Sequence, residues 1–357
     1  MDVPDWLGGA KALGCQNLLG ARIAVNHRDA LRSPISVGSD FDLRLVRLFG
    51  AHPRSYRGLS LGHPPKNDAT RTIPATTPEE LEQAHAYAYG GCVIQDLGYY
   101  PFSSRLFSDL THYVRSGDFI VALIRESKDL NEYAFALGAL AHYAADNNGH
   151  RIATNLAVPI LYPKLRKEFG KTVTYWDNPL SHGRTEFGFD VLQVAQGRYA
   201  PDWYRAFIGF QVSKPVLERA FQDTYGIEMK DLFRDLSLAI GTYRYTVGSI
   251  LPGMTRVAWR LKKDSLIKEI PGATQKKFLY NLSRSSYEKE WGTEYHKAGF
   301  RTKLVTWLFR VIPKSGPLNS LPFRTPTPEI EKMFMASFNA TVDNYRILLG
   351  NVAAGRA

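Results

Sequence analysis

Apolar positions recur with a helical period along most of the chain after residue 72, which predicts an all-α protein built as a multi-helix bundle. Alternating runs of Val, Ile and Thr are scarce, so no sheet is expected. Helices are expected to begin at Thr77, Ser108, Ser116 and Leu130, near Asn178 and Ser213, and after Met229. Further helical stretches are expected over 273–290, 297–312 and 327–349. Pro252 is expected to end or kink the helix after Met229, near Leu251.

A strong helix-start signal marks the point where this pattern begins. Thr77 is a good N-cap, Pro78 suits the first turn, and Glu79 and Glu80 lie at the positive end of the helix dipole. Residues 1–72 are rich in Gly, Arg, Pro and Ser, which indicates a disordered or aberrant N-terminal arm. We therefore expect a helical domain over 73–312. An extended connection and a C-terminal helix that packs on this domain are expected over 313–357.

Composition narrows the class of partner but does not choose one. The net charge of +11 favours partners that carry phosphate, and anionic lipid, phosphate esters and nucleic acid all fit. A basic protein without a polyanionic partner fits as well. The two cysteines, Cys15 and Cys92, support neither a disulfide framework nor a cysteine-based zinc site. No apolar run of ~18 residues predicts a membrane span, and no secretory signal precedes the helices.

The most informative segment is the small, apolar run 134–146, which has the composition of a helix at the centre of a bundle. His142 and Asp146 interrupt it four residues apart and therefore share a face. Burying both is costly unless a partner compensates them, and a metal ion does so. A hydrogen-bonded His–Asp pair is the alternative. His150 extends the same face if the helix continues through Asn147, Asn148 and Gly149.

Two further sets of metal-type ligands flank this segment. His182 and Glu186 are again four residues apart, and Asp96 precedes His112 by sixteen residues. Each has an ordinary alternative, such as a solvated surface pair, a turn residue or an exposed helix position. Together these histidines and carboxylates form a nitrogen and oxygen ligand set that suits Zn²⁺ without sulfur. Helical bundles build such sites from pairs at i and i+4, so a metal site between core helices is predicted.

In this order, the residues Asp96 and His112, the run AFALGALAHYAADNNGH and the run SHGRTE resemble the zinc-dependent phospholipase C family, to which single-strand-specific zinc nucleases are related. The resemblance implies that His112, His142 and Asp146 share one zinc ion. It also implies that His150, His182 and Glu186 share a second. Asp96 takes the place of the family's aspartate near the metals, as ligand or general base. Asp146 is the best candidate for a bridging carboxylate.

The chain departs from the family in two places. The gap between Asp146 and His150 is shorter than usual. The family also completes a third zinc site with its mature amino terminus and a nearby histidine, and residues 1–72 lack that sequence. Reading codons for residues 49–64 one nucleotide later can yield SALTHEAIVDSAWDTH, so a frameshift is one explanation, which the nucleotide sequence tests. The chain would then be secreted or periplasmic; as written, its localisation stays open.

The resemblance implies a zinc-dependent phosphodiesterase, with phospholipid head-group cleavage as the first expectation. Tyr99, Tyr100, Phe102 and Phe107 lie near Asp96 in sequence and either line a lipid or choline pocket or pack in the core. Peripheral contact with a membrane surface is expected. The alternatives are a single-strand nuclease with the same metals, and a catalytically impaired metal-binding protein that lacks the third site.

Overall fold

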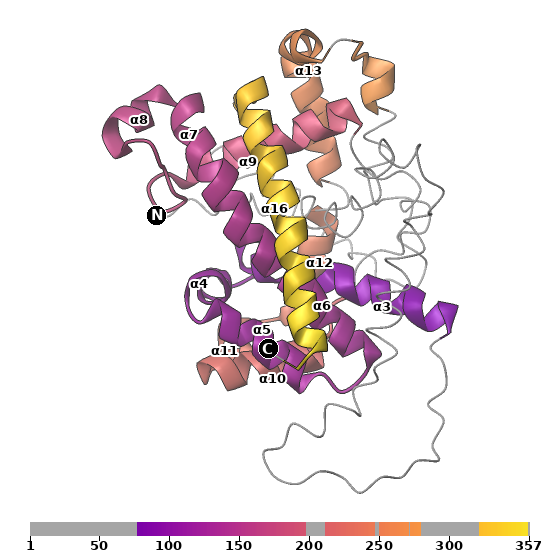
Figure 1. Cartoon of the computed structure of the whole chain (residues 1–357). Coiled ribbons are helices and arrows are strands. Elements are labelled where there is room, and N and C mark those ends of the chain that lie inside the picture. The colour runs from indigo at the N-terminus through magenta and orange to yellow at the C-terminus, as the bar shows by residue number, and fades with distance from the viewer. Residues whose placement is uncertain (1–76, 198–210, 247–249, 271, 280–320, 356–357) are drawn as a thin grey trace, which may run out of the picture.

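A computed structural model describes residues 77–197, 211–246, 250–270, 272–279 and 321–355. Within these ranges every regular element is a helix and no strand occurs, which confirms the prediction of an all-α fold (Figure 1). The first half of the domain contains α3 (Pro78–Gly91), η3 (Ile94–Tyr99), α4 (Arg105–Tyr113), α5 (Ser116–Glu126), α6 (Leu130–Gly149), η4 (His150–Thr154) and α7 (Asn155–Leu161). The later elements are α8 (Pro163–Phe169), α9 (Pro179–Gln196), α10 (Lys214–Tyr225), α11 (Met229–Leu232), α12 (Leu236–Tyr245), α13 (Leu251–Glu269) and α16 (Pro328–Ala353). None of the described helices combines the length and apolar character that crossing a bilayer requires.

Side-chain caps explain where several helices begin. Thr77 and Glu80 form a capping box, in which Glu80 N donates to Thr77 Oγ1 at 3.2 Å and Thr77 N donates to Glu80 Oε2 at 2.8 Å. Asn178 Oδ1 accepts from the backbone of α9, and Thr327 caps α16 in the same way. The starts predicted at Thr77, Ser116, Leu130, Asn178 and Ser213 therefore agree with the structure to within a residue.

The helix predicted after Met229 was wrong in its length. α11 ends after one turn at Phe233, whose backbone is extended and whose side chain is buried. Asp235 then starts α12 by accepting from Leu238 N at 2.9 Å. Pro252 lies in the first turn of α13, where a proline forfeits no helical hydrogen bond. Residues 247–249, which connect α12 to this turn, lie outside the described ranges, so the end or kink expected near Leu251 stays a prediction.

Other sequence expectations differ in position or lie outside the described residues. The helix expected at Ser108 begins at Arg105, and α7, α8 and α13 were not predicted. The arm over 1–72, the helix over 297–312 and the larger parts of 273–290 and 313–326 fall outside the described ranges. The division into domains therefore stays a prediction.

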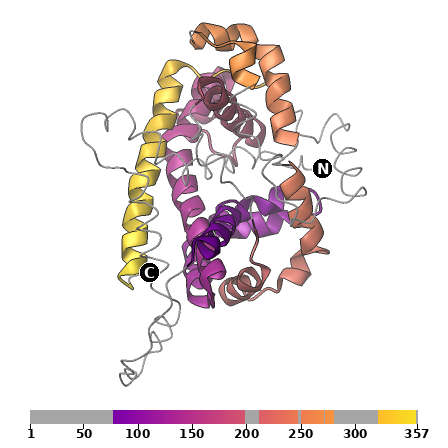
Figure 2. The ribbon, with the colours of Figure 1, turned by 90° about the vertical axis from the view of Figure 1, so that its right-hand side faces the viewer.

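Helix α6 forms the centre of the bundle, and its small residues allow neighbouring backbones to approach closely. A Cβ added at Gly138 would lie 1.9 Å from Ala88 O on α3, and one at Gly91 would lie 1.8 Å from Phe135 O on α6. On another side, α16 runs along α6 (Figures 1 and 2), and Tyr345 Oη donates to Leu137 O at 2.9 Å. The helix that carries His142 and Asp146 is thus held on more than one side.

We expect Gly138→Ala to lower the free energy of unfolding by about 3 kcal/mol, because the added methyl group meets backbone and the helices must separate. Gly350→Ala is the matched control: this helical glycine has nothing within 4 Å of an added Cβ, so the change should stabilise slightly. Chemical denaturation of both variants measures the difference. Equal stability of the two would contradict the close approach of α3 and α6.

Candidate metal centre

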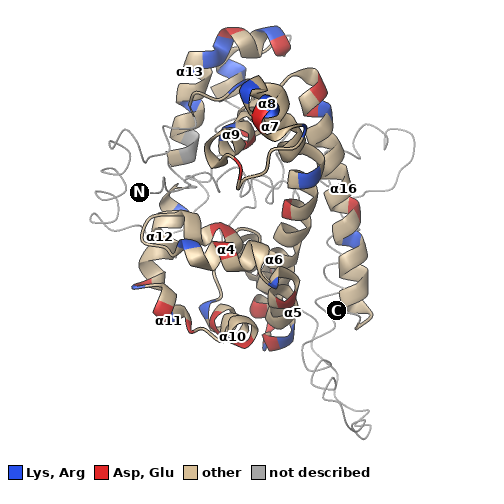
Figure 3. Ribbon diagram, turned by 90° about the vertical axis from the view of Figure 1, so that its left-hand side faces the viewer, with Lys and Arg blue, Asp and Glu red and all other residues tan. Residues whose placement is uncertain are grey.

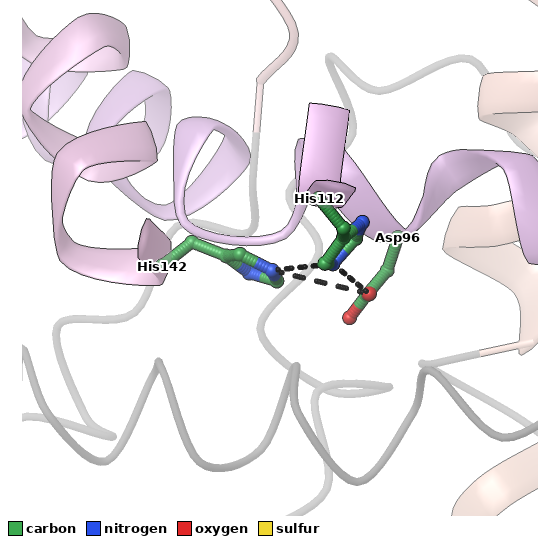
Figure 4. Close-up of side chains that lie close together, drawn as sticks. All are labelled: Asp96, His112 and His142. Atoms are coloured by element: carbon green, nitrogen blue, oxygen red, sulfur yellow. Dashed lines mark hydrogen bonds and ion pairs between the residues drawn. The ribbon is translucent and has the colours of Figure 1, made fainter. Parts of the chain in front are cut away.

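Three segments bring Asp96, His112 and His142 together in the interior (Figure 4). Asp96 lies on η3, His112 in the last turn of α4 and His142 on α6. Asp96 Oδ1 is 3.3 Å from His112 Nε2 and 3.9 Å from His142 Nε2. All three side chains are buried, with at most 1% of each exposed. We call these residues the inner group.

Backbone carbonyls orient the two imidazoles of the inner group. His112 Nδ1 lies 2.8 Å from Ser108 O, and His142 Nδ1 lies 2.9 Å from Cys92 O. Since a carbonyl only accepts, each Nδ1 carries the proton and each Nε2 presents a lone pair. The two Nε2 atoms are 3.2 Å apart, beside a carboxylate oxygen. A shared proton or a cation relieves the repulsion between these atoms, and an N, N, O donor set suits zinc.

Ser108 fixes the position of Asp96 relative to His112. Its hydroxyl accepts from Gly98 N at 2.9 Å and donates to Gln95 O. These two bonds tie η3 to α4 on both sides of Asp96. The backbone oxygen of the same serine accepts from His112, as described above. Ser108 therefore orients one member of the inner group and anchors the turn that carries another, although the sequence offered no signal for this role.

A second set of donors, the outer group, consists of His150, His182 and Glu186. Glu186 Oε1 lies 3.5 Å from His150 Nε2 and 3.5 Å from His182 Nδ1. His182 Nε2 donates to Asn155 Oδ1 at 3.0 Å, so its Nδ1 carries the lone pair that faces Glu186. His182 is buried, whereas the side chains of His150 and Glu186 keep some exposure. This is again an N, N, O donor set.

Asp146 lies between the two groups. Its Oδ1 is 3.2 Å from His150 Nε2 and 4.0 Å from His112 Nε2, so one oxygen faces a histidine of each group. Helix α6 continues through Gly149 and passes into the π-helical turn η4, which begins at His150. That continuity keeps His150 on the face of Asp146 despite the short spacing in the sequence. Such π turns often occur at functional sites.

The structure separates the four aromatic residues that the sequence placed near Asp96. The ring of Tyr99 lies 5.8 Å from that of His112, while Tyr100 and Phe107 are buried against Tyr243 and Phe221. Phe102 is exposed. Three of the four therefore pack in the core, and one of these, Tyr99, also contacts the inner group.

Two residues near the outer group were missed by sequence reasoning. Asn155 accepts from His182 across 27 sequence positions, and no local pattern marks such a partner. Asp190 follows Glu186 by one helical turn, so the HxxxE pattern extends to HxxxExxxD on α9. Burial, together with the nearby Glu186 carboxylate, raises the pKa of Asp190 well above its usual range. Both causes favour the neutral form of this carboxyl group.

Comparison with known proteins identifies one family. The family model described as zinc dependent phospholipase C matches residues 62–235, a range that contains all seven predicted ligands. No curated protein and no solved structure matches the chain. The matched range begins near the end of the N-terminal arm.

We expect Asn155→Ala to weaken zinc binding by about 10- to 100-fold, because His182 loses the acceptor that fixes its tautomer. Competition with a chromophoric zinc chelator measures the affinity. Asn147→Ala is the control, since this exposed amide donates to Tyr143 O within α6. An equal affinity in both variants would show that Asn155 does not orient a ligand.

Proposed function

Because residues 62–235 belong to the zinc-dependent phospholipase C family, we propose that the protein hydrolyses phosphodiester bonds with bound zinc and releases the head group of a phospholipid. The observation that carries this proposal is the place of Asp146. One of its oxygens faces a histidine of each donor group, and a carboxylate in that position can bridge two metal ions. Paired metal ions are a recurrent arrangement in enzymes that cleave phosphate esters.

We assign the residues of the two groups as zinc ligands. Asp96, His112 and His142 would hold one zinc ion, His150, His182 and Glu186 would hold the other, and Asp146 would serve both. The donor chemistry fits, because both sets combine imidazole nitrogens and carboxylate oxygens, which zinc prefers. The hydrogen bonds of Ser108, Cys92 and Asn155 to the rings supply the outer-shell support that such ligands need.

Paired zinc ions supply Lewis-acid stabilisation of phosphate oxygens and lower the pKa of water. The protein's own residues supply orientation and proton handling. Asp146, His150 and Glu186 retain partial exposure, so the phosphate approaches from their side. Asp96 is fully buried and lies within 3.9 Å of both inner imidazoles, which favours ligation over a role as the general base. If Asp96 instead accepts a proton, its replacement leaves the zinc content unchanged.

We expect Asp146→Ala to lose both zinc and hydrolysis, since its carboxylate faces both donor groups. Elemental analysis and turnover of a phosphatidylcholine analogue measure the two effects. Asp343→Ala, which removes an exposed carboxylate on α16, should change neither. Full activity in the Asp146 variant would end the proposal.

We expect two zinc ions per chain at neutral pH, because the described residues supply two ligand groups. The family's third position requires residues near the amino terminus that residues 1–72 do not match. Fewer than one zinc ion per chain would favour the catalytically impaired alternative. Two ions without turnover would identify the third position as the missing element.

The choice of substrate is tested by comparing a phosphatidylcholine analogue with single-stranded DNA. We expect turnover of the lipid analogue and little cleavage of the DNA. The nuclease alternative has one specific observation behind it, because the partly exposed ring of Tyr175 lies beside His182 and can stack on a base. Loss of each activity with a zinc chelator excludes contaminating metal-independent enzymes. Faster cleavage of DNA than of lipid would replace the proposed substrate.

A further inference from the structure

An exposed apolar surface lies next to the two donor groups. It comprises Leu106 and Tyr113 on α4, Val114 at the end of that helix, and Trp176 in the loop before α9, and we call these four residues the aromatic face. Leu106 and Tyr113 are seven residues apart and therefore share one side of α4. Trp176 is 59% exposed, and its ring lies 5.3 Å from that of Tyr113.

Ring contacts connect the aromatic face to both donor groups. The ring of Tyr113 lies 5.9 Å from that of His112 in the inner group. The ring of Trp176 lies 6.0 Å from that of Tyr175, which in turn lies 5.9 Å from that of His182 in the outer group. Tyr113 therefore contacts a member of the inner group directly, and Trp176 is connected to the outer group through the ring of Tyr175. A molecule held on the aromatic face is close to the proposed reaction site.

Basic residues lie on the same side of the molecule. Segment 163–172, which contains α8, carries one acidic residue, Glu168, and four exposed cations: Lys164, Arg166, Lys167 and Lys171. The four cations and one acid make this segment +3. None of these cations forms an ion pair with another described residue. α4 and α8 face the viewer together in Figure 3 and share the left-hand edge of Figure 1.

We propose that the aromatic face is a docking surface for a phospholipid bilayer that contains anionic lipid, with α8 at the level of the head groups. This proposal rests on the proposed function, and it identifies the surface through which the protein contacts its lipid substrate. Trp and Tyr suit the boundary between head groups and acyl chains, because each has an apolar ring and a polar edge. The cations of α8 complement the negative charge of anionic head groups.

The test is flotation of the zinc-loaded full chain with vesicles of phosphatidylcholine, with and without phosphatidylglycerol. We expect Trp176→Ser and Leu106→Ser each to lower partitioning by about tenfold, as partial loss of a buried large apolar side chain predicts. Ile347→Ser is the matched control, since Ile347 is 63% exposed on α16. It should partition like the wild type. Thermal unfolding of each variant confirms that the fold is kept.

A second pair of variants tests the charge. Lys164→Gln with Lys167→Gln should weaken binding to anionic vesicles by about fivefold for each charge removed at low salt. Binding to neutral vesicles should change little. The control is Lys263→Gln with Lys268→Gln on α13, where both side chains are also exposed. An equal loss of binding in the two double variants would show that net charge alone determines the effect. It would overturn the proposal that α8 lies at the level of the head groups.

Binding and hydrolysis are measured separately, so the two proposals fail separately. Flotation repeated with a zinc chelator needs no turnover. Partitioning that depends on Trp176, without any hydrolysis, would defeat the proposed function and leave the docking surface standing. Hydrolysis with equal partitioning of the Trp176 and Ile347 variants would overturn the docking surface. A change in oligomeric state of the Trp176 variant in size-exclusion chromatography would instead assign the face to a second copy of the chain.

Discussion

The structure depends on how donor atoms buried at the centre of the bundle are compensated. Two imidazole nitrogens face each other at 3.2 Å beside the carboxylate of Asp96, in a place with almost no exposure to water. Burying such atoms is costly unless a proton or cation lies among them. Because the donors come from η3, α4 and α6, a cation there also ties these elements together. A zinc ion bound there would therefore stabilise the fold.

The core and the candidate site share one helix. Gly138 and Gly91 let α3 and α6 approach so closely that their backbones nearly touch. That approach also places Cys92 O, at the end of α3, within 2.9 Å of His142 Nδ1. The small residues of α6 therefore decide the orientation of a proposed ligand, and not only the density of packing. A wider spacing between α3 and α6 would separate His142 Nδ1 from Cys92 O.

Exposure is lowest in the inner group, higher at Asp146 and at His150 of the outer group, and highest on the aromatic face. Asp96 and His142 are sealed in the core, Asp146 and His150 are partly exposed, and Trp176 is largely exposed. This gradient gives the candidate centre a closed side and an open side. The two imidazoles on the closed side are held by backbone carbonyls. The open side is where a phosphate ester and the surface that carries it can approach, in line with the proposed function.

The sequence by itself determined the helical class, most of the helix starts before α11, and the pairs His142–Asp146 and His182–Glu186, because capping residues and i, i+4 pairs are local signals. Asp96 and His112 form no such pair, and only the resemblance to the family connected them with the others. It misjudged the stretch after Met229, where Asp235 starts a new helix and buried Phe233 interrupts the old one. Only the tertiary structure decided which donors meet. Asp96, His112 and His142 converge through the packing of separate elements, and Asn155 on α7 reaches His182 on α9 across α8 and the loop that follows it. Contacts of that kind depend on distances between helices, which a linear pattern of residues does not encode locally.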